Sequence, residues 1–279
     1  MTAYFQCGRY RFDLSGPFAR PLVMGILNVT PDSFSDGGNH VTLSAALFRA
    51  EQMIEEGADI IDIGAESTRP GAEPVSVQEE LDRLMPVVEA LRECGKPLSI
   101  DTHKPEVMTA ALAAGADMIN NIAGFSSAGS VKSLVPGDCG LCVMHMQGSP
   151  KTMQISPVYV DVTKETIAFL KERTEALFAA GVSRERICID PGFGFGKTFE
   201  QNLTLFKDLA QIRSALQLPL LVGLSRKSLI GAITGRDLRG RLAGNLGAAL
   251  SAISHGADIL RVHEVAETVD ALKVWRAAR

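Results

Sequence analysis

A short pattern that occurs three times in this chain restricts its fold more than any other feature. A Gly-Ala-Asp triplet followed by two apolar residues stands at 57–61, 115–119 and 256–260, each time after an amphipathic stretch. Glycine just after a helix can take the left-handed conformation that ends it, so each copy predicts a helix end, a short turn and a strand start. A looser fourth copy, Gly181-Val-Ser183, precedes the apolar residues 187–189. The repeat predicts alternating helices and strands.

Two stretches between the repeats have the spacing of helices that cover a sheet. The first carries an apolar face made of Leu43, Leu47, Ala50, Met53 and Ile54. The second opens with Ser76-Val-Gln-Glu79, the pattern of a capping box, in which each of the two outer side chains bonds the other's backbone N–H. It continues with Leu81, Leu84, Val88 and Leu91. The spacing of three and four residues predicts one buried face on each helix.

Short runs that are apolar almost throughout alternate with these helices, as expected of strands covered on both faces. They lie near residues 22–27, 59–64, 98–100, 117–119, 140–144, 187–189, 219–224 and 258–262. Parallel strands with right-handed helical crossovers normally close into a barrel when there are eight of them. We therefore expect one α/β domain over residues 1–279, a (β/α)8 TIM barrel with an N-terminal β-hairpin near 4–13 beneath it. The alternative is an open doubly wound sheet, but no Gly-x-Gly-x-x-Gly follows the first run.

Composition limits the class of partner. The 279 residues are 46% hydrophobic and 22% charged with a net charge of −4, so the chain can bury a core and offers no basic surface for nucleic acid. No apolar run could span a membrane and the first residues do not resemble a signal peptide, which predicts a cytoplasmic protein. The five cysteines are expected to be free. Cys139-Gly-Leu-Cys142 near His145 suggests a redox pair or a zinc site, but a strand is the favoured interpretation because no second Cys-x-x-Cys exists.

All eight expected strands are followed by polar residues. In order these are Asn28, residues 66–69, residues 101–103, Asn120-Asn121, His145, Asp190, residues 225–227, and Arg261 with His263. We call the residues that follow a strand its exit. Loops are commonly polar, and Asp or Asn often caps the following helix, so one polar exit alone is weak evidence for a functional site. In a barrel, however, all eight exits converge at the carboxyl end of the strands, where active sites lie.

The chemistry of these exits falls into two groups. Asp101, Asn120, Asp190 and Lys227 offer acceptors and donors that suit a nitrogen heterocycle. Asn28, Thr68, Arg261 and His263 suit phosphate oxygens, and barrels commonly bind phosphate on the loops after strands 7 and 8. The expected ligand is a small phosphorylated molecule.

A glycine-rich segment follows Asp190 and ends in Gly196-Lys197-Thr198, like a nucleotide-binding P-loop. The P-loop pattern requires glycine at 191, where this chain has proline. The favoured interpretation is that the glycines let the backbone approach a flat ligand that Phe193 or Phe195 covers. Two further loops, 30–38 and 67–72, contain Asp32, Phe34 and Arg69, which are unusual in mere connectors, although disordered loops are the alternative.

Taken together, these motifs resemble dihydropteroate synthase. The resemblance runs from about residue 22 to the last strand and rests on segments 25–38, 66–71, 99–102, 190–197, 225–228 and 261–263. One departure is visible, because that family usually has Asn-Asp after strand 4 and this chain has Asn120-Asn121. The presumed ligand contact, Asn120, is retained, and the role of Asn121 is open.

The resemblance implies condensation of 6-hydroxymethyl-7,8-dihydropterin diphosphate with p-aminobenzoate in folate synthesis. By similarity, Asp101, Asn120, Asp190 and Lys227 hold the pterin, whereas Asn28, Thr68, Arg261 and His263 hold the diphosphate, with Mg2+ near Asn28. The implied catalytic residues are Asp32, Thr68, Arg69, Lys227, Arg261 and His263, and Met144 is a further substrate contact. Asp32, Phe34, Thr68, Arg69 and Pro70 would close over the site. Candidates for lining the p-aminobenzoate pocket are Arg69, Phe195, Lys227 and Ser228, and which one meets its carboxylate is open.

Two rival functions share this fold. Methyltransferases that act on methyltetrahydrofolate and a corrinoid have a similar ring pocket but need no diphosphate site, so residues 261–263 and the two long loops favour the synthase. A silent pterin-binding protein would be expected to have lost loop or leaving-group residues, and none is lost. The family also implies a homodimer through the later helices.

Overall fold

Eight strands form one sheet in the computed structural model, which describes residues 4–15, 19–30, 39–69, 71–132, 134–135 and 137–278. The strand order is β8-β7-β6-β5-β4-β3-β10-β9, and every pair of neighbours is parallel. An additional parallel bridge joins Ile189 to Leu220, which brings the two outer strands of this order together and closes the barrel. The predicted (β/α)8 barrel is confirmed.

The strands agree with their expected positions to within a residue or two, with one exception. Their bounds are β3 Leu22–Asn28, β4 Ile60–Gly64, β5 Leu98–Asp101, β6 Met118–Asn121, β7 Gly140–Met144, β8 Ile187–Asp190, β9 Leu221–Val222 and β10 Ile259–Val262. The run 219–224 was expected to be one strand, but only its centre pairs regularly. Its first residues contribute the bridge at Leu220 and a hydrogen bond from the Ile189 N–H to the Pro219 carbonyl.

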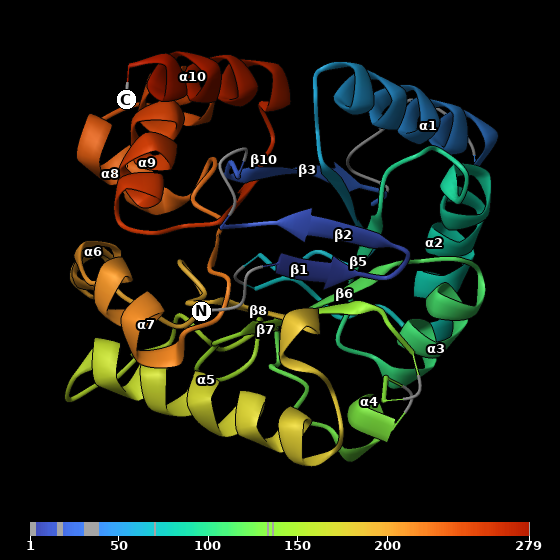
Figure 1. The fold of residues 1–279 in the computed structure, drawn as a ribbon, viewed down its shortest axis with the longest axis horizontal. Coiled ribbons are helices and arrows are strands. Elements are labelled where there is room, and N and C mark those ends of the chain that lie inside the picture. Colours follow the sequence, from blue (N-terminus) through green and yellow to red (C-terminus); the bar gives the residue numbers. More distant parts are fainter. Residues whose placement is uncertain are drawn as a thin grey trace.

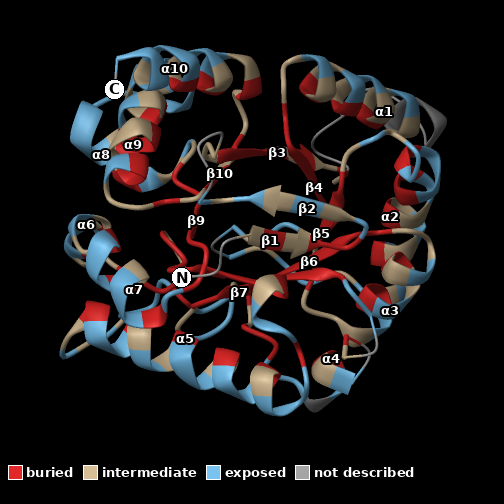
Figure 2. Ribbon diagram, viewed as in Figure 1, coloured by how far each residue is buried: buried red, intermediate tan, exposed pale blue. Residues whose placement is uncertain are grey.

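Helices surround the strands as a ring (Figure 1). Their bounds are α1 Asn39–Glu55, α2 Val77–Leu91, α3 Pro105–Ala113, α4 Ala128–Lys132, α5 Val162–Ala179, α6 Phe199–Lys207, α7 Leu209–Leu216, α8 Ser228–Thr234, α9 Leu242–Ser254 and α10 Val265–Ala277, with short 3-10 turns at Arg184–Arg186 and Leu238–Gly240. Figure 2 shows buried residues on the strands and on the inward faces of the helices, and exposed residues on the outward faces. None of the helices in the described ranges is long and apolar enough to cross a membrane.

The repeat has the predicted conformation and a further role in the fold. Its glycines end helices with positive φ, at 99° for Gly57, 109° for Gly115 and 97° for Gly256, and Gly181 matches them at 99°. Each repeat aspartate accepts the backbone N–H of a residue at or beside the start of the neighbouring strand, at distances of 2.8 to 3.1 Å: Asp59 from Val23, Asp117 from Leu98 and Asp258 from Leu220. Each carboxylate also pairs with an arginine, namely Arg20, Arg9 and Arg213. The three repeats therefore tie the starts of three pairs of neighbouring strands together.

The predicted hairpin closes the amino end of the barrel. Strand β1 (Tyr4–Cys7) pairs with β2 (Tyr10–Asp13) in antiparallel register, and the pair lies across the barrel in Figure 1. Phe5 and Cys7 are fully buried in an apolar cluster with side chains inside the barrel: Leu22, Met24, Ile60, Met118, Cys142, Cys188, Leu221 and Ile259. The hairpin therefore covers the amino end of the barrel interior with apolar side chains.

Two local expectations have definite outcomes. All five cysteines are free, and Cys142 lies within β7, which agrees with the strand interpretation. Only half of the expected capping box forms at α2. The Ser76 hydroxyl accepts the Glu79 N–H at 3.2 Å, but the Glu79 carboxylate bonds Arg83 one turn later. An arginine within reach outcompetes the backbone N–H for that carboxylate because the pair is charged.

Candidate functional site

The carboxyl ends of the strands bring the predicted polar side chains together. Strand pairing sets Asn28 opposite Gly64, Asp101 opposite Asn120, and Met144 opposite Asp190. Side chains on a strand alternate in direction, so residues in register on neighbouring strands share a face of the sheet. Asn120, Met144 and Asp190 are buried, whereas Asn28 and Asp101 are half-buried.

Asp62 lies at the centre of this group, and the sequence analysis did not single it out. Its side chain is 0% exposed. It accepts hydrogen bonds from Ser99 Oγ at 2.6 Å and from Asn120 Nδ2 at 3.3 Å. It also pairs with Arg261 Nε at 2.6 Å. No pattern marked this residue, because it stands in an otherwise apolar strand.

Arg261 spans two carboxylates inside the barrel. Besides its contact with Asp62, its terminal nitrogen lies 2.8 Å from Asp101 Oδ2. Burial alone would lower the pKa of this guanidinium, but the two carboxylates raise it above its ordinary value. The structure thus brings Arg261, which the sequence grouped with phosphate ligands, into contact with the residues grouped as ring ligands. These bonds use two of its five N–H donors.

Two acceptor oxygens in this group have no partner among the described residues. They are Asp101 Oδ1 and Asn120 Oδ1, and both atoms are buried. A buried acceptor without a donor costs free energy, and native structures retain few of them without a reason. The pair is therefore prepared for a ligand that brings N–H or O–H donors.

The glycine-rich loop after β8 approaches β7 so closely that a side chain would not fit. Gly192 has φ 70°, and a Cβ there would lie 1.8 Å from the His145 carbonyl oxygen. Its N–H donates to Asp190 Oδ1 at 2.7 Å, which orients that carboxylate. Burial raises the pKa of Asp190, and Lys227 and the Gly192 N–H oppose the shift.

Two lysines hold the same loop by its carbonyl groups. Lys197 donates to the Gly192 carbonyl at 2.9 Å and the Phe195 carbonyl at 3.1 Å, and Lys227 donates to the Phe193 carbonyl. The Lys227 ammonium lies 4.7 Å from the centre of the Phe195 ring. Of the two aromatic candidates, Phe193 is fully buried against Phe206, so only Phe195 borders the site.

The buried charges shift one another's pKa values. Burial raises the pKa of Asp101 to about 7, with Asp62 contributing and Arg261 opposing. Burial lowers the pKa of Lys227 to about 8, and Arg261 adds to this while Asp190 opposes it. Strongly shifted groups that lie together are typical of functional sites.

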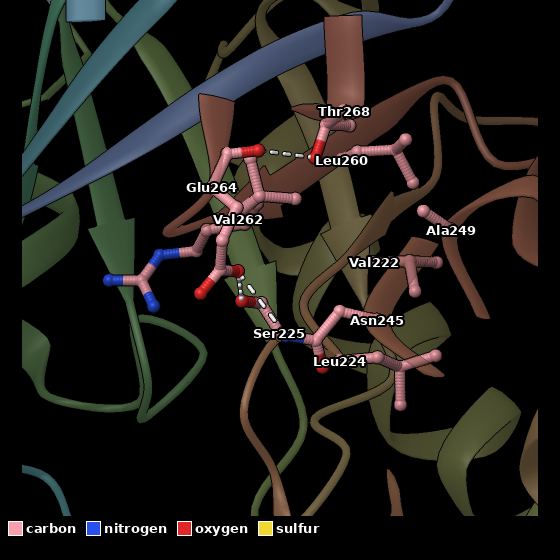
Figure 3. A pocket seen from close by; sticks show the side chains of 10 residues that line it. Val222, Leu224, Ser225, Asn245, Ala249, Leu260, Val262, Glu264 and Thr268 are labelled. Atoms are coloured by element: carbon pink, nitrogen blue, oxygen red, sulfur yellow. Dashed lines mark hydrogen bonds between the residues drawn. The ribbon is translucent and has the colours of Figure 1, made fainter. Parts of the chain in front are cut away.

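The loops after β9 and β10 form a second polar cluster, of which Figure 3 shows Ser225 and Glu264. His263 Nδ1 lies 2.9 Å from Ser225 Oγ, and Ser225 donates to the Glu264 carboxylate at 3.0 Å. Burial lowers the pKa of His263 to about 3. Because Ser225 occupies Nδ1, a ligand would have to meet His263 at Nε2. A cavity of about 10 Å³ beside this cluster has room for one water molecule and no substrate.

The chain preceding Lys227 is held in an unusual conformation. Arg226 has φ 61°, which is uncommon for a residue with a side chain. Its N–H donates to Asn245 Oδ1 at 3.1 Å, its carbonyl accepts from Arg241 at 2.8 Å, and its Nε lies 2.6 Å from Glu264. These three contacts fix the turn that presents Lys227 and Ser228.

The remaining predicted residues lie at the rim or outside the described part of the chain. Thr68 is half-buried, and Arg69 and Ser228 are exposed. The loop of Arg69 is tied to the loop after β7 by a hydrogen bond of 3.3 Å from the Gly71 N–H to the Pro150 carbonyl. Asp32, Phe34 and Pro70 lie outside the described residues.

Some of the polar residues that follow the strands bind other parts of the chain and thereby stabilise the fold. Glu66 binds Lys104 at 2.7 Å and the Val75 N–H at 3.1 Å. Asn121 Oδ1 accepts the N–H groups of Ala123 and Phe125, so it stabilises the turn after β6. An aspartate could accept both of these bonds, so either residue can hold this turn.

Comparison with known proteins gives one consistent result. A family model described as pterin binding enzyme matches residues 24–263. Dihydropteroate synthases of Neisseria meningitidis serogroup C and Haemophilus influenzae are both 48% identical to this chain; the first alignment covers 98% of this chain and 96% of the relative, and the second 92% and 94%.

Solved structures agree. The Burkholderia cenocepacia dihydropteroate synthase complexed with 7,8-dihydropteroate has 51% identity and a TM-score of 0.88 over 99% of this chain and 96% of its own. The Xanthomonas albilineans enzyme with 4-aminobenzoic acid has 47% identity and a TM-score of 0.92 over 100% and 98%. The chain therefore belongs to the dihydropteroate synthases, the transferases of folate biosynthesis that form 7,8-dihydropteroate.

Proposed function

We propose that the barrel binds 6-hydroxymethyl-7,8-dihydropterin diphosphate and p-aminobenzoate through the residues described above and condenses them to 7,8-dihydropteroate and diphosphate. The observation that carries this assignment is the pair of buried acceptors, Asp101 Oδ1 and Asn120 Oδ1, that lack donors among the described residues. The amino-pyrimidine edge of a pterin supplies N–H donors. Asp190 adds another acceptor, and Lys227 donates to a ring oxygen or nitrogen. Met144 and Phe195 supply apolar contact to the ring.

The diphosphate lies, in this proposal, between β3 and β10. Asn28, Thr68 and His263 meet its oxygens, and the N–H groups of Arg261 that do not bind Asp62 or Asp101 reach it from the ring pocket. His263 binds an anion best as a cation, although burial lowers its pKa to about 3 without ligand. A neighbouring diphosphate would raise that pKa, because an opposite charge favours the protonated form.

Bond formation needs no covalent enzyme intermediate. The amine nitrogen of p-aminobenzoate attacks the methylene carbon of the pterin, the carbon–oxygen bond to diphosphate breaks, and the amine loses a proton. Negative charge grows on the leaving group, so Arg261, and His263 when it carries a proton, stabilise the transition state more than the ground state. The proposal keeps Asp32, Phe34, Thr68, Arg69 and Pro70 as the residues that close the site and exclude water.

Magnesium belongs to this proposal, with Asn28 as its protein ligand. A Cβ at Gly64 would lie 3.9 Å from Asn28 Oδ1 and 3.8 Å from Asp101 Oδ2, so glycine keeps the space beside these oxygens open. No three His, Cys, Asp or Glu side chains in the described ranges converge as a metal site. A cation that draws its other ligands from phosphate and water, as Mg2+ does, fits such a place. When bound, it would neutralise the charge of the leaving group.

Association into a homodimer through the later helices is also proposed. An apolar groove of about 240 Å³ lies on α6, α8 and α9 and is lined by Phe206, Ile230, Ile233, Thr234, Gly244, Gly247, Ala248 and Ser251. Ile233 is 54% exposed there, and Leu238 and Leu242 are exposed nearby. Exposed apolar surface of this kind supports self-association. Sedimentation of the wild type and of Ile233→Asp tests it, since the substitution should yield monomers. A single domain over residues 1–279 and a cytoplasmic location complete the proposal.

The decisive experiment measures diphosphate release and dihydropteroate formation. With Mg2+, the purified protein should release diphosphate at the full rate only when both substrates are present. Chelation of Mg2+ should abolish the reaction, and added Mg2+ should restore it. A protein that binds pterin but forms no dihydropteroate under these conditions would refute the proposed reaction. Sulfonamides should compete with p-aminobenzoate.

A further inference from the structure

We propose that Asp62 is a positioning residue for the pterin, because it determines which atoms of Asn120 and Asp101 face the ligand. The inference rests on the proposed pterin pocket. Asp62 is the fully buried carboxylate in the middle of β4, one layer above the apolar cluster that contains Ile60. Being buried beneath Asn120 and Arg261, it acts through these residues and not by direct contact.

The orientation of Asn120 follows from the chemistry of Asp62. An ionised carboxylate accepts hydrogen bonds and donates none, whereas an amide has one donor end and one acceptor end. Asn120 must therefore turn Nδ2 toward Asp62 Oδ2, and the distance between these atoms is 3.3 Å. Its Oδ1 is left buried without a partner among the described residues, as an acceptor for a ligand. With an apolar residue at 62, nothing would select this orientation of the amide.

Arg261 transmits the same influence to Asp101. Asp62 Oδ2 holds Arg261 Nε at 2.6 Å, and the terminal nitrogen of Arg261 occupies Asp101 Oδ2 at 2.8 Å. Asp101 Oδ1 is consequently the oxygen left for the ligand. One buried carboxylate thus sets two acceptors on neighbouring strands, which is the pattern that the N–H groups of an amino-pyrimidine ring require.

Ser99 provides a matched control, because it binds the other oxygen of the same carboxylate. Ser99 Oγ donates to Asp62 Oδ1 at 2.6 Å and has no hydrogen bond to Asn120 or Arg261 in the described structure. Ser99→Ala removes one buried contact of Asp62 but leaves both positioning contacts in place. A purely structural role of the buried cluster would make this variant resemble those at Asp62.

The first test measures binding of 6-hydroxymethylpterin by calorimetry, with thermal unfolding as the check on folding. Asp62→Asn can keep its oxygen toward Arg261 and its amide toward Ser99, so binding should weaken only about tenfold. Asp62→Leu should weaken it about a hundredfold or more, and Ser99→Ala less than about threefold. The KM for p-aminobenzoate at saturating pterin should stay within about threefold in Asp62→Asn. Wild-type binding by Asp62→Leu, or equal losses in all three variants, would overturn the inference.

A second test remains decisive if Asp62→Leu does not fold. Asn120→Asp sets a second carboxylate against Asp62 and should weaken pterin binding severely. Adding Asp62→Asn removes the charge that faces the new carboxylate, so the double variant should recover at least about tenfold in affinity. Additive losses would contradict the positioning role. If the wild-type protein itself bound no pterin, the proposed function would fail instead.

Discussion

The ammonium of Lys197 lies 2.9 Å from the carbonyl oxygen of Gly192, inside the loop that the lysine itself ends. It also lies 3.1 Å from the carbonyl of Phe195, and the side chain is only 2% exposed. Burial lowers its pKa to about 7. Lys197 resembles a P-loop lysine in sequence, but it donates to backbone carbonyl groups of its own loop. It thereby fixes the turn that carries Phe195 to the site.

Replacing Lys197 by methionine should both destabilise the protein and weaken pterin binding. The change removes the donor from two carbonyl groups, and we expect a loss of about 2 kcal/mol in the free energy of unfolding. Urea unfolding and pterin titration check the two effects. Lys171→Met is the control, because Lys171 is 64% exposed on α5 and should change stability by less than about 0.5 kcal/mol. Equal stability of the two variants would show that the loop holds without Lys197.

The pH dependence of kcat/KM for the pterin diphosphate should have a narrow maximum between the pKa values of Asp101 and Lys227. Burial raises the pKa of Asp101 to about 7, so the rate should rise as the pH rises through 7 and this acceptor becomes anionic. Burial lowers the pKa of Lys227 to about 8, so the rate should fall above 8 as the ammonium loses its proton. This parameter reports groups of the free enzyme. In the residual activity, Asp101→Asn should flatten the acid limb of the pH profile, and Lys227→Met should flatten the alkaline limb. A limb that stays unchanged in its variant would have to be assigned to another group.

His145 should make the protein sensitive to acid. The ring is buried against Phe169, and burial lowers its pKa to about 3. In the unfolded chain its pKa is about 6.5, so between these values the unfolded state binds the extra proton and stability falls as the pH falls. The free energy of unfolding should drop by up to about 1.4 kcal/mol per pH unit from this group. In His145→Asn, denaturant midpoints measured from pH 6.5 to 4 should decline less steeply. Parallel curves for the two proteins would exclude His145 as the source.

The fold could be predicted because its signals are local. A glycine after each amphipathic stretch must end the helix, and an apolar run must be buried, so the Gly57 and Gly115 repeats alone indicate the alternation of helices and strands. The number of residues that pair in each strand was harder to predict. Strand β9 is only Leu221–Val222, because the residues before it close the barrel by a single bridge. Such pairing depends on the curvature of the whole sheet, which the sequence of one strand does not contain.

The site was predictable only as far as the strand ends. The rule that polar exits converge found Asp101, Asn120 and Asp190, but it does not distinguish a ligand contact from an internal partner such as Glu66, which is bound to Lys104. It also missed Asp62, which lies before the strand end and looks like an interruption of an apolar run. Which interior polar side chains pair is decided by register between strands, and register emerges only when the barrel closes.

Lys227 and Arg69 should divide the two substrates between them. Lys227 lies over the Phe195 ring, near the acidic groups Asp101 and Asp190, whereas Arg69 is exposed on the loop after β4. Lys227→Ala should therefore weaken pterin binding by about a hundredfold, since it removes a charged donor from a buried pocket. Arg69→Ala should leave pterin affinity within about threefold and raise the KM for p-aminobenzoate about tenfold or more. Calorimetry with the pterin and steady-state rates at saturating pterin separate these effects.

Lys151→Ala is the control for Arg69. Lys151 pairs with Glu73, which is on the same loop as Arg69, and both side chains are exposed, so the pair contributes little to stability. Equal effects of Lys227→Ala and Arg69→Ala on both substrates would refute the division, and an Arg69→Ala defect reproduced by Lys151→Ala would assign it to the loop and not to the guanidinium.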